Sequence, residues 1–120
     1  MPFVRIDAVG TDNLEALGNA VHDAMVETLE IPADDRFQVL NGGATLKYDD
    51  YLGIHRDEGV VFVAITMRPG RTDERKKALY RRIAELAEEY AGTEPRNVLI
   101  TINETDLVNW SLGNGEAQYA

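Results

Sequence analysis

The strongest constraint on the fold of this chain is a strand–helix–strand pattern that occurs twice along the sequence. The first copy lies over residues 3–40 and the second over residues 60–103. An alternation of apolar and polar residues predicts a strand, and apolar residues three or four positions apart predict a helix. Two parallel strands joined by a helix require a right-handed crossover, so each copy predicts one βαβ unit.

The first copy begins with an alternating strand over residues 3–9, whose apolar side chains share one face. Thr11 or Asp12 is the expected N-cap of the next helix, because short polar side chains accept hydrogen bonds from the first turn. Apolar residues at helical spacing predict that this helix covers residues 14–29. The stretch "RFQVL" then predicts the second strand.

The second copy begins with "VVFVAITM", which predicts a strand that is apolar on both faces, as buried parallel strands are. Thr72 is the expected N-cap of the second helix, and Gly92 is its expected end. Four residues at helical spacing form its expected buried stripe: Leu79, Ile83, Leu86 and Tyr90. The stretch "NVLITIN" predicts the fourth strand.

These elements predict a single domain over residues 1–120 with an α/β (α+β) fold, a double βαβ with a four-stranded mixed sheet and two helices on one face. The pseudo-repeats cover about residues 2–41 and 60–104, and residues 105–120 form a C-terminal segment. Because the two helices cover one face only, we expect further copies to cover the other face in a symmetric homo-oligomer.

Composition and charge exclude several classes of function. The 120 residues include no cysteine, which rules out disulfides, thiol nucleophiles and thiolate metal sites. The formal net charge of −9 disfavours attraction to the phosphates of a nucleic acid. Neither a membrane span nor a signal peptide is recognised, so a cytoplasmic protein without membrane contact is expected. His22 and His55 have no second ligand at metal spacing, so we expect no metal site.

The expected topology brings five candidate functional residues to one edge of the sheet. If the two halves pack around a local twofold axis, the starts of the first two strands meet the ends of the last two. Pro2, Asp35, Arg68, Arg71 and Trp110 then share that edge. Both arginines also precede a helix N-terminus, where free N–H groups favour an anion. The expected ligand is therefore a small oxo acid, whose carboxylate the two guanidinium groups can hold.

Proline at position 2 allows two interpretations. It is compatible with the first position of a strand, where its missing N–H costs no ladder hydrogen bond. It is also small enough for the preceding Met1 to be removed during processing, which would leave the Pro2 nitrogen as a free secondary amine. The sharper expectation is that Pro2 becomes the terminus and carries the chemistry.

Five segments together resemble the tautomerase superfamily, and most of all its malonate semialdehyde decarboxylase branch: "MP", "IPADDRFQ", "MRPGRTDE", "NVLITINE" and "NWSLGNGEAQY". The resemblance covers nearly the whole chain. It implies the double βαβ fold assembled as a homotrimer, and a cofactor-independent enzyme. It also implies that Pro2 is the catalytic amine and that Asp35 tunes this amine or orients water.

The same resemblance implies that Arg68 and Arg71 anchor the substrate and that Trp110 and Leu112 wall the pocket. The chain departs from the decarboxylase pattern at three points, one of which is that it ends soon after "AQYA", without the longer tail of that enzyme. Gly70 increases the spacing between the arginines, and position 112 is Leu where Phe is common. These departures lie around the pocket, so they affect the expected substrate and not the fold.

Two mechanisms remain open at this point. If nearby cations and burial lower the pKa of the Pro2 amine, Pro2 is a neutral base and the reaction is keto–enol tautomerisation. If Asp35 keeps the amine cationic, the reaction is decarboxylation of a 3-oxo acid such as malonate semialdehyde, with hydration of an unsaturated acid as a side activity. We place tautomerisation slightly ahead.

Structural roles are the alternative for each site residue. Asp35 could end the first helix, the arginines could be solvated surface charges, and Trp110 could belong to the core or an interface. A non-catalytic trimer that binds small acids or partner proteins is the alternative for the whole chain, because the fold alone does not establish an activity.

Overall fold

The computed structural model describes residues 1–120 and contains both predicted βαβ units. The first unit consists of β1 (Pro2–Ala8), α1 (Leu14–Leu29) and β2 (Gln38–Asn41). The second consists of β3 (Val61–Met67), α2 (Asp73–Ala91) and β4 (Val98–Glu104), with a short 3-10 helix η1 (Pro95–Asn97) before β4. A second 3-10 helix, η2 (Leu107–Asn109), begins the C-terminal segment.

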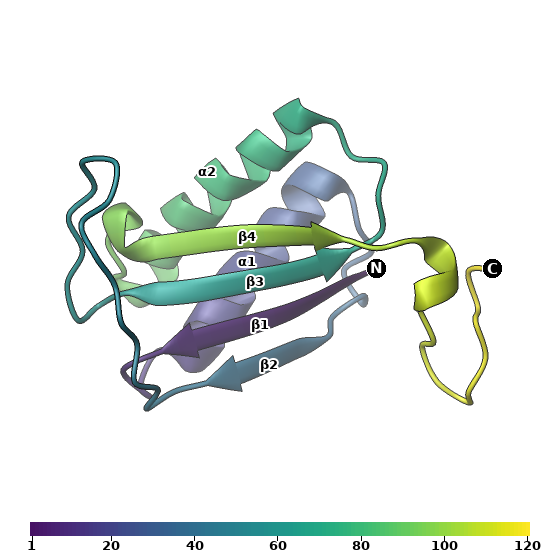
Figure 1. Ribbon diagram of the computed structural model, residues 1–120, viewed down its shortest axis with the longest axis horizontal. Coiled ribbons are helices and arrows are strands. Elements are labelled where there is room, and N and C mark those ends of the chain that lie inside the picture. Colours follow the sequence, from purple (N-terminus) through teal and green to yellow (C-terminus); the bar gives the residue numbers. More distant parts are fainter.

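The strands form one four-stranded sheet in the order β2-β1-β3-β4 (Figure 1). β1 pairs parallel to β2, and β3 pairs parallel to β4, whereas β1 and β3 are antiparallel. Pro2 is opposite Met67, so β1 begins where β3 ends. This is the mixed sheet with two opposed halves that the sequence pattern predicts, and the predicted fold class is confirmed.

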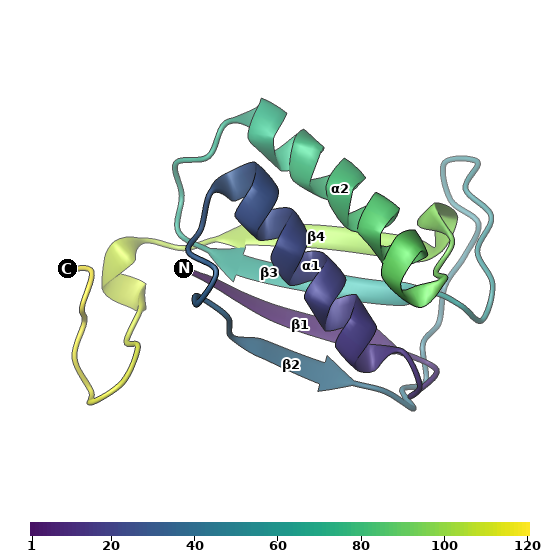
Figure 2. The ribbon, with the colours of Figure 1, turned by 180° about the vertical axis from the view of Figure 1, so that it is seen from behind.

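Both helices pack on the same face of the sheet (Figure 2). The core lies between the layers because the apolar positions of β1 and β3 alternate toward the helices, with Val4, Ile6, Val63 and Ile65 at most 2% exposed. Side chains of α1 and α2 complete one hydrophobic cluster of 18 buried residues. Burial of this cluster is the main favourable contribution to folding.

The N-cap of the first helix lies one or two residues after Asp12 or Thr11, the expected N-caps. Asn13 occupies the N-cap position, and its side chain makes no capping hydrogen bond. Instead its amide donates to the carbonyl oxygen of Ala91 at 3.1 Å, which ties the start of α1 to the end of α2. The local sequence pattern does not contain this long-range contact.

The expectation that Tyr90 is buried is wrong. Its side chain is 40% exposed, and its hydroxyl donates to the Asp23 carboxylate at 2.7 Å. The last turn of α2 carries the polar end of this ring to the surface. The other end assignments of α2 are confirmed: the Thr72 hydroxyl accepts a hydrogen bond from the Arg75 N–H, and Gly92 ends the helix in a left-handed conformation with a φ of 69°.

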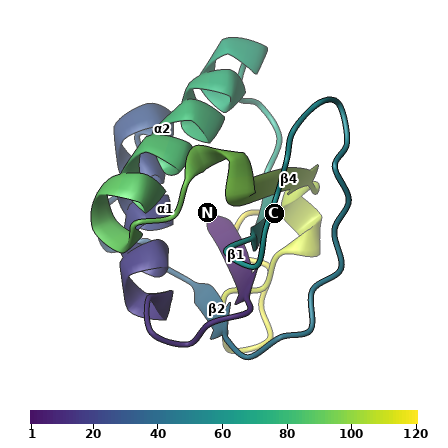
Figure 3. The ribbon, with the colours of Figure 1, turned by 90° about the vertical axis from the view of Figure 1, so that its left-hand side faces the viewer.

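The second face of the sheet carries no helix. Residues 42–60 form the long connection between β2 and β3, which lies on the side of the sheet opposite to the helices (Figure 3). Several large apolar side chains of this face are exposed in the single chain, among them Phe3 at 43%, Val39 at 38% and Leu99 at 39%. β3 is therefore buried on one face only within one chain. No helix is both long and apolar enough to span a membrane.

Candidate active site

The start of the chain lies against the loop that follows α1. Asp35 is held in this loop by a backbone hydrogen bond from its N–H to the Pro32 carbonyl at 3.1 Å. The buried His22 ring donates its Nε2–H to the carbonyl oxygen of Ala33 at 2.8 Å and fixes the same loop to α1. The Asp35 side chain is 15% exposed, and its Oδ2 atom lies 3.6 Å from the amine of Met1.

Met1 and Pro2 are both buried, and Met1 is only 8% exposed. The start of the chain is therefore packed into this edge of the sheet and is not exposed to solvent. Asp35 Oδ1 is buried and has no hydrogen-bond partner, so it keeps an acceptor available at this edge. An unsatisfied buried oxygen of this kind is costly, and a catalytic role is one explanation for such an atom.

The two arginines lie in the connection between β3 and α2. Arg68 follows the last residue of β3, and Arg71 precedes the Thr72 N-cap. Gly70 between them has a φ of 118°, a conformation that other residues rarely adopt. Arg68, Arg71, Leu107 and the two residues between the arginines line a hollow of about 360 Å³.

The arginines and Asp35 act in opposite directions on the terminal amine. Burial lowers the pKa of the Met1 amine, the Asp35 carboxylate raises it, and Arg68 and Arg71 lower it again. The net direction is downward from the ordinary value of 8.0. Burial also lowers the pKa of Arg71, with Arg68 as the second cause. The site thus combines an amine of reduced basicity with two cations.

The two expected wall residues of the C-terminal segment, Trp110 and Leu112, differ in their burial. Trp110 is half-buried, and its Nε1–H group is buried without an acceptor. Leu112 is 40% exposed and does not line the hollow beside the arginines. Leu107 lines that hollow, although the sequence analysis does not single it out. Its only sequence signal is its position just after β4, at the edge where the other groups converge.

Tyr119 is a second residue that the sequence analysis missed. The guanidinium carbon of Arg68 lies 5.2 Å from the centre of the Tyr119 ring. The only signal in the sequence is an aromatic residue near the end of a segment that already contains Trp110. Its contact depends on how residues 111–120 fold back, which local patterns do not predict.

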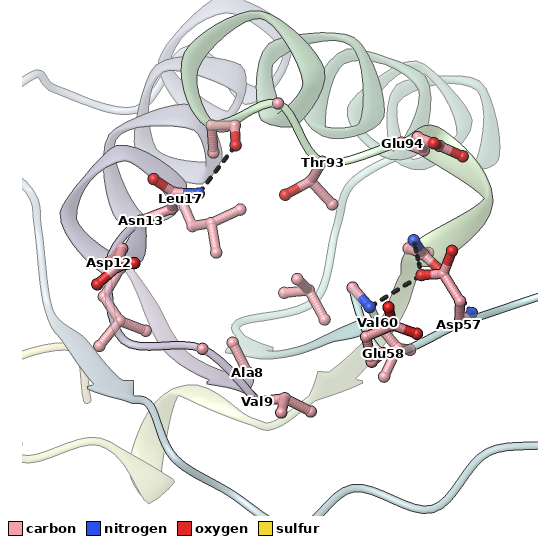
Figure 4. Close-up of a pocket in the computed structure, with 17 residues that line it drawn as sticks. Ala8, Val9, Asp12, Asn13, Leu17, Asp57, Glu58, Val60, Thr93 and Glu94 are labelled. Atoms are coloured by element: carbon pink, nitrogen blue, oxygen red, sulfur yellow. Dashed lines mark hydrogen bonds between the residues drawn. The ribbon is translucent and has the colours of Figure 1, made fainter.

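A second hollow, of about 380 Å³, lies at the opposite end of the sheet (Figure 4). It contains no arginine or lysine, and its charged lining is acidic: Asp12, Asp57, Glu58 and Glu94. Like charges would repel a carboxylate there. The edge that contains Asp35 and the arginines is therefore the better site for an oxo acid.

The fold and this edge define a class of small βαβ–βαβ proteins in which the start of β1 lies beside a carboxylate and two arginines. Comparison with known proteins identifies the family. The family described as tautomerase enzyme matches residues 35–113, and a second family of the same description matches residues 2–43. A probable tautomerase of Bacillus subtilis, YusQ, is 35% identical over 124 residues, which cover 98% of each chain. The chain belongs to the tautomerase superfamily.

Two solved structures place the chain near one branch of this family. The FG41 malonate semialdehyde decarboxylase inhibited by 3-bromopropiolate is 36% identical with a TM-score of 0.88, covering 98% of this chain and 93% of that one. A malonate semialdehyde decarboxylase with decarboxylase and hydratase activities is 30% identical with a TM-score of 0.87, covering 98% and 95%. The predicted resemblance to this branch is confirmed.

Proposed function

We propose that this chain, once Met1 has been removed, is a keto–enol tautomerase for small oxo acids in which the Pro2 nitrogen is the general base. The observation that carries the proposal is the position of the terminal amine. The amine of Met1, the residue bonded to Pro2, lies 3.6 Å from Asp35 Oδ2, and burial with Arg68 and Arg71 lowers its pKa. Once Met1 is removed, the same groups would act on the Pro2 nitrogen. An amine that is neutral at working pH can accept a proton from carbon.

Removal of Met1 would have two consequences at this edge. It would turn the amide nitrogen of Pro2 into a secondary amine, and it would vacate the space that the buried methionine side chain fills. The Pro2 nitrogen would then lie at the same edge as Arg68 and Arg71, which already act on the amine of Met1. A small oxo acid could place its carboxylate on the arginines and the hydrogens of the carbon next to its keto group near the amine.

The proposed reaction moves one proton and needs no co-reactant. The neutral Pro2 nitrogen takes a proton from the carbon next to the carbonyl, which gives an enolate and a pyrrolidinium ion. The proton then returns to the enolate oxygen and forms the enol. Arg68 and Arg71 would hold the carboxylate and stabilise the negative charge that develops during the first step.

Decarboxylation of a 3-oxo acid is the second candidate, and one contact favours it. The Asp35 carboxylate raises the pKa of the Met1 amine, whereas burial and the two arginines lower it. If the same carboxylate dominates for Pro2, the pyrrolidinium ion would polarise the 3-carbonyl while the C–C bond to the departing carboxylate breaks. The electron pair of that bond would form an enolate, and carbon dioxide would leave. The two decarboxylases at 30% and 36% identity support this candidate.

The open face of the sheet supports assembly of several copies. Phe3, Val39 and Leu99 are exposed on this face in the single chain. We propose that they are covered in a homotrimer, because large apolar side chains gathered on one surface favour self-association. Sedimentation velocity would test this assembly, and a monomer would contradict it.

Turnover assays with three substrates test the proposed function. We expect the purified protein to convert phenylpyruvate between its keto and enol forms, with malonate semialdehyde and an acetylenic oxo acid as the other substrates. Faster turnover of malonate semialdehyde would favour the decarboxylase. Binding of a carboxylic acid without any turnover would favour a non-catalytic binding protein.

A further inference from the structure

Within the chain, the guanidinium group of Arg68 makes a cation–π contact with Tyr119. Its guanidinium carbon lies over the Tyr119 ring, 5.2 Å from the ring centre. Neither Arg68 nor Arg71 belongs to any of the nine ion pairs within the chain, whereas the more exposed Arg75 pairs with Glu30. The side-chain nitrogen atoms of Arg68 are thus free for an external anion.

The segment that carries Tyr119 is braced by its own hydrogen bonds. The Gln118 side chain accepts from the Leu112 N–H at 2.8 Å and donates to the Gly113 carbonyl at 2.8 Å. Gly113 also forms an isolated antiparallel bridge with Glu116, which closes a tight turn. Gln118 precedes Tyr119 directly, so these bonds fix the backbone next to the aromatic ring.

A ring beneath a guanidinium group leaves the N–H groups in the guanidinium plane available. The ring attracts the cation through its face, whereas a carboxylate accepts hydrogen bonds at the edge of the group. Both contacts can therefore exist at the same time. A flexible arginine that is held before the substrate arrives loses less conformational freedom on binding.

We propose that Tyr119 is a positioning residue that holds the Arg68 guanidinium ready for the substrate carboxylate. This inference rests on the proposed function, in which Arg68 contacts that carboxylate. Tyr119 itself need not touch the reacting atoms. Residues 111–120 therefore have a defined role, which is to place one aromatic ring against one substrate-binding arginine.

The first test is a set of single variants in the full-length protein. Tyr119→Leu should raise KM for phenylpyruvate about 10-fold with little change in kcat, because the lost contact orders a binding group. Tyr119→Phe retains the ring, so its KM should stay close to that of the wild type. Tyr90→Leu, the same change at an exposed tyrosine near the other end of the sheet, should keep the wild-type KM. Equal effects of the Leu and Phe variants would overturn the proposal.

The second test asks whether Tyr119 acts through Arg68. In an Arg68→Ala background, Tyr119→Leu should have almost no further effect on KM, because the group that it positions is absent. Full additivity of the two changes would overturn the proposal. Thermal unfolding of each variant separates this coupling from a general loss of stability, which would lower the melting temperature in both backgrounds alike.

The third test does not depend on turnover. In the NMR spectrum of the ligand-free protein, the ring should shift the Arg68 side-chain proton signals upfield in wild type and in Tyr119→Phe, and the shift should vanish in Tyr119→Leu. Absence of the shift in wild type would overturn the contact itself. If the shift is present but no oxo acid turns over and malonate does not bind in calorimetry, the proposed function fails, and with it the role of this contact.

Discussion

Pro2 at the start of β1 lies directly opposite Met67 at the end of β3 in the antiparallel pair of central strands. This register places the beginning of the chain beside Arg68, the next residue after β3. It also explains how residues separated by more than half of the sequence share one edge. The parallel pairing of β1 with β2 adds Asp35 from the loop that precedes β2.

Replacement of Arg71 by Ala should weaken substrate binding. A hydrogen bond to a charged group contributes about 1.5–3 kcal/mol, so KM for an oxo acid should rise on the order of 10- to 100-fold. Arg75→Ala is the matched control, because Arg75 lies one helical turn further on and pairs at 3.5 Å with the exposed Glu30. Steady-state kinetics of both variants check this prediction, and an equal loss in the control would contradict it.

Replacement of Asp35 by Asn should lower the pKa of the terminal amine further, because the carboxylate is the strongest influence that raises it. If Pro2 is a base, the acid limb of the kcat/KM profile should move to lower pH. If Pro2 acts as a cation, the variant should instead lose activity near neutral pH. The pH dependence of kcat/KM with phenylpyruvate and malonate semialdehyde distinguishes the two mechanisms.

Gly70→Ala should impair the arginine pair without a steric clash. No atom lies within 4 Å of the position that a Cβ would occupy, but the φ of 118° is unfavourable for alanine. The strain should cost about 1–3 kcal/mol or shift the connection between Arg68 and Arg71. We expect a higher KM or a lower melting temperature, measured by kinetics and calorimetry. Wild-type values of both would show that the glycine conformation is not needed.

Asp57 should make the fold sensitive to acid. Hydrogen bonds from the Gly59 N–H, the Arg96 guanidinium and the Asn97 amide lower its pKa from 3.8 to about 2. Between these two values the unfolded chain binds more protons than the folded chain, so stability falls as the pH decreases. In Asp57→Asn this contribution is absent. Urea unfolding at several pH values should show that the difference from wild type shrinks toward pH 2, whereas a constant difference would count against this role of Asp57.

The sequence predicts the fold well because each half carries its own alternating and helical patterns. The N-cap of α1 and the exposure of Tyr90 were missed, because both depend on contacts between α1 and α2. Strand pairing follows from the repeat, since two similar βαβ halves can share a sheet in few ways.

The sequence predicts that Asp35, Arg68 and Arg71 lie near the start of the chain, but it does not predict the neighbouring residues Leu107 and Tyr119. Asp35, Arg68 and Arg71 all act on the amine at the start of the chain, as the topology implies. Leu107 and Tyr119 escaped prediction because they belong to an irregular segment, whose path depends on turns and side-chain bonds and not on periodicity. The roles of all six predicted site residues in catalysis or binding remain predictions: Pro2, Asp35, Arg68, Arg71, Trp110 and Leu112.

The most direct test of the central claim is an NMR titration of the Pro2 nitrogen in protein labelled with ¹⁵N-proline. The account predicts that Met1 is absent and that this nitrogen titrates below the ordinary α-amino value of about 8. An amide signal that does not titrate would show that Met1 is retained. A pKa of the Pro2 nitrogen at or above that of an ordinary α-amino group would contradict its role as a neutral base.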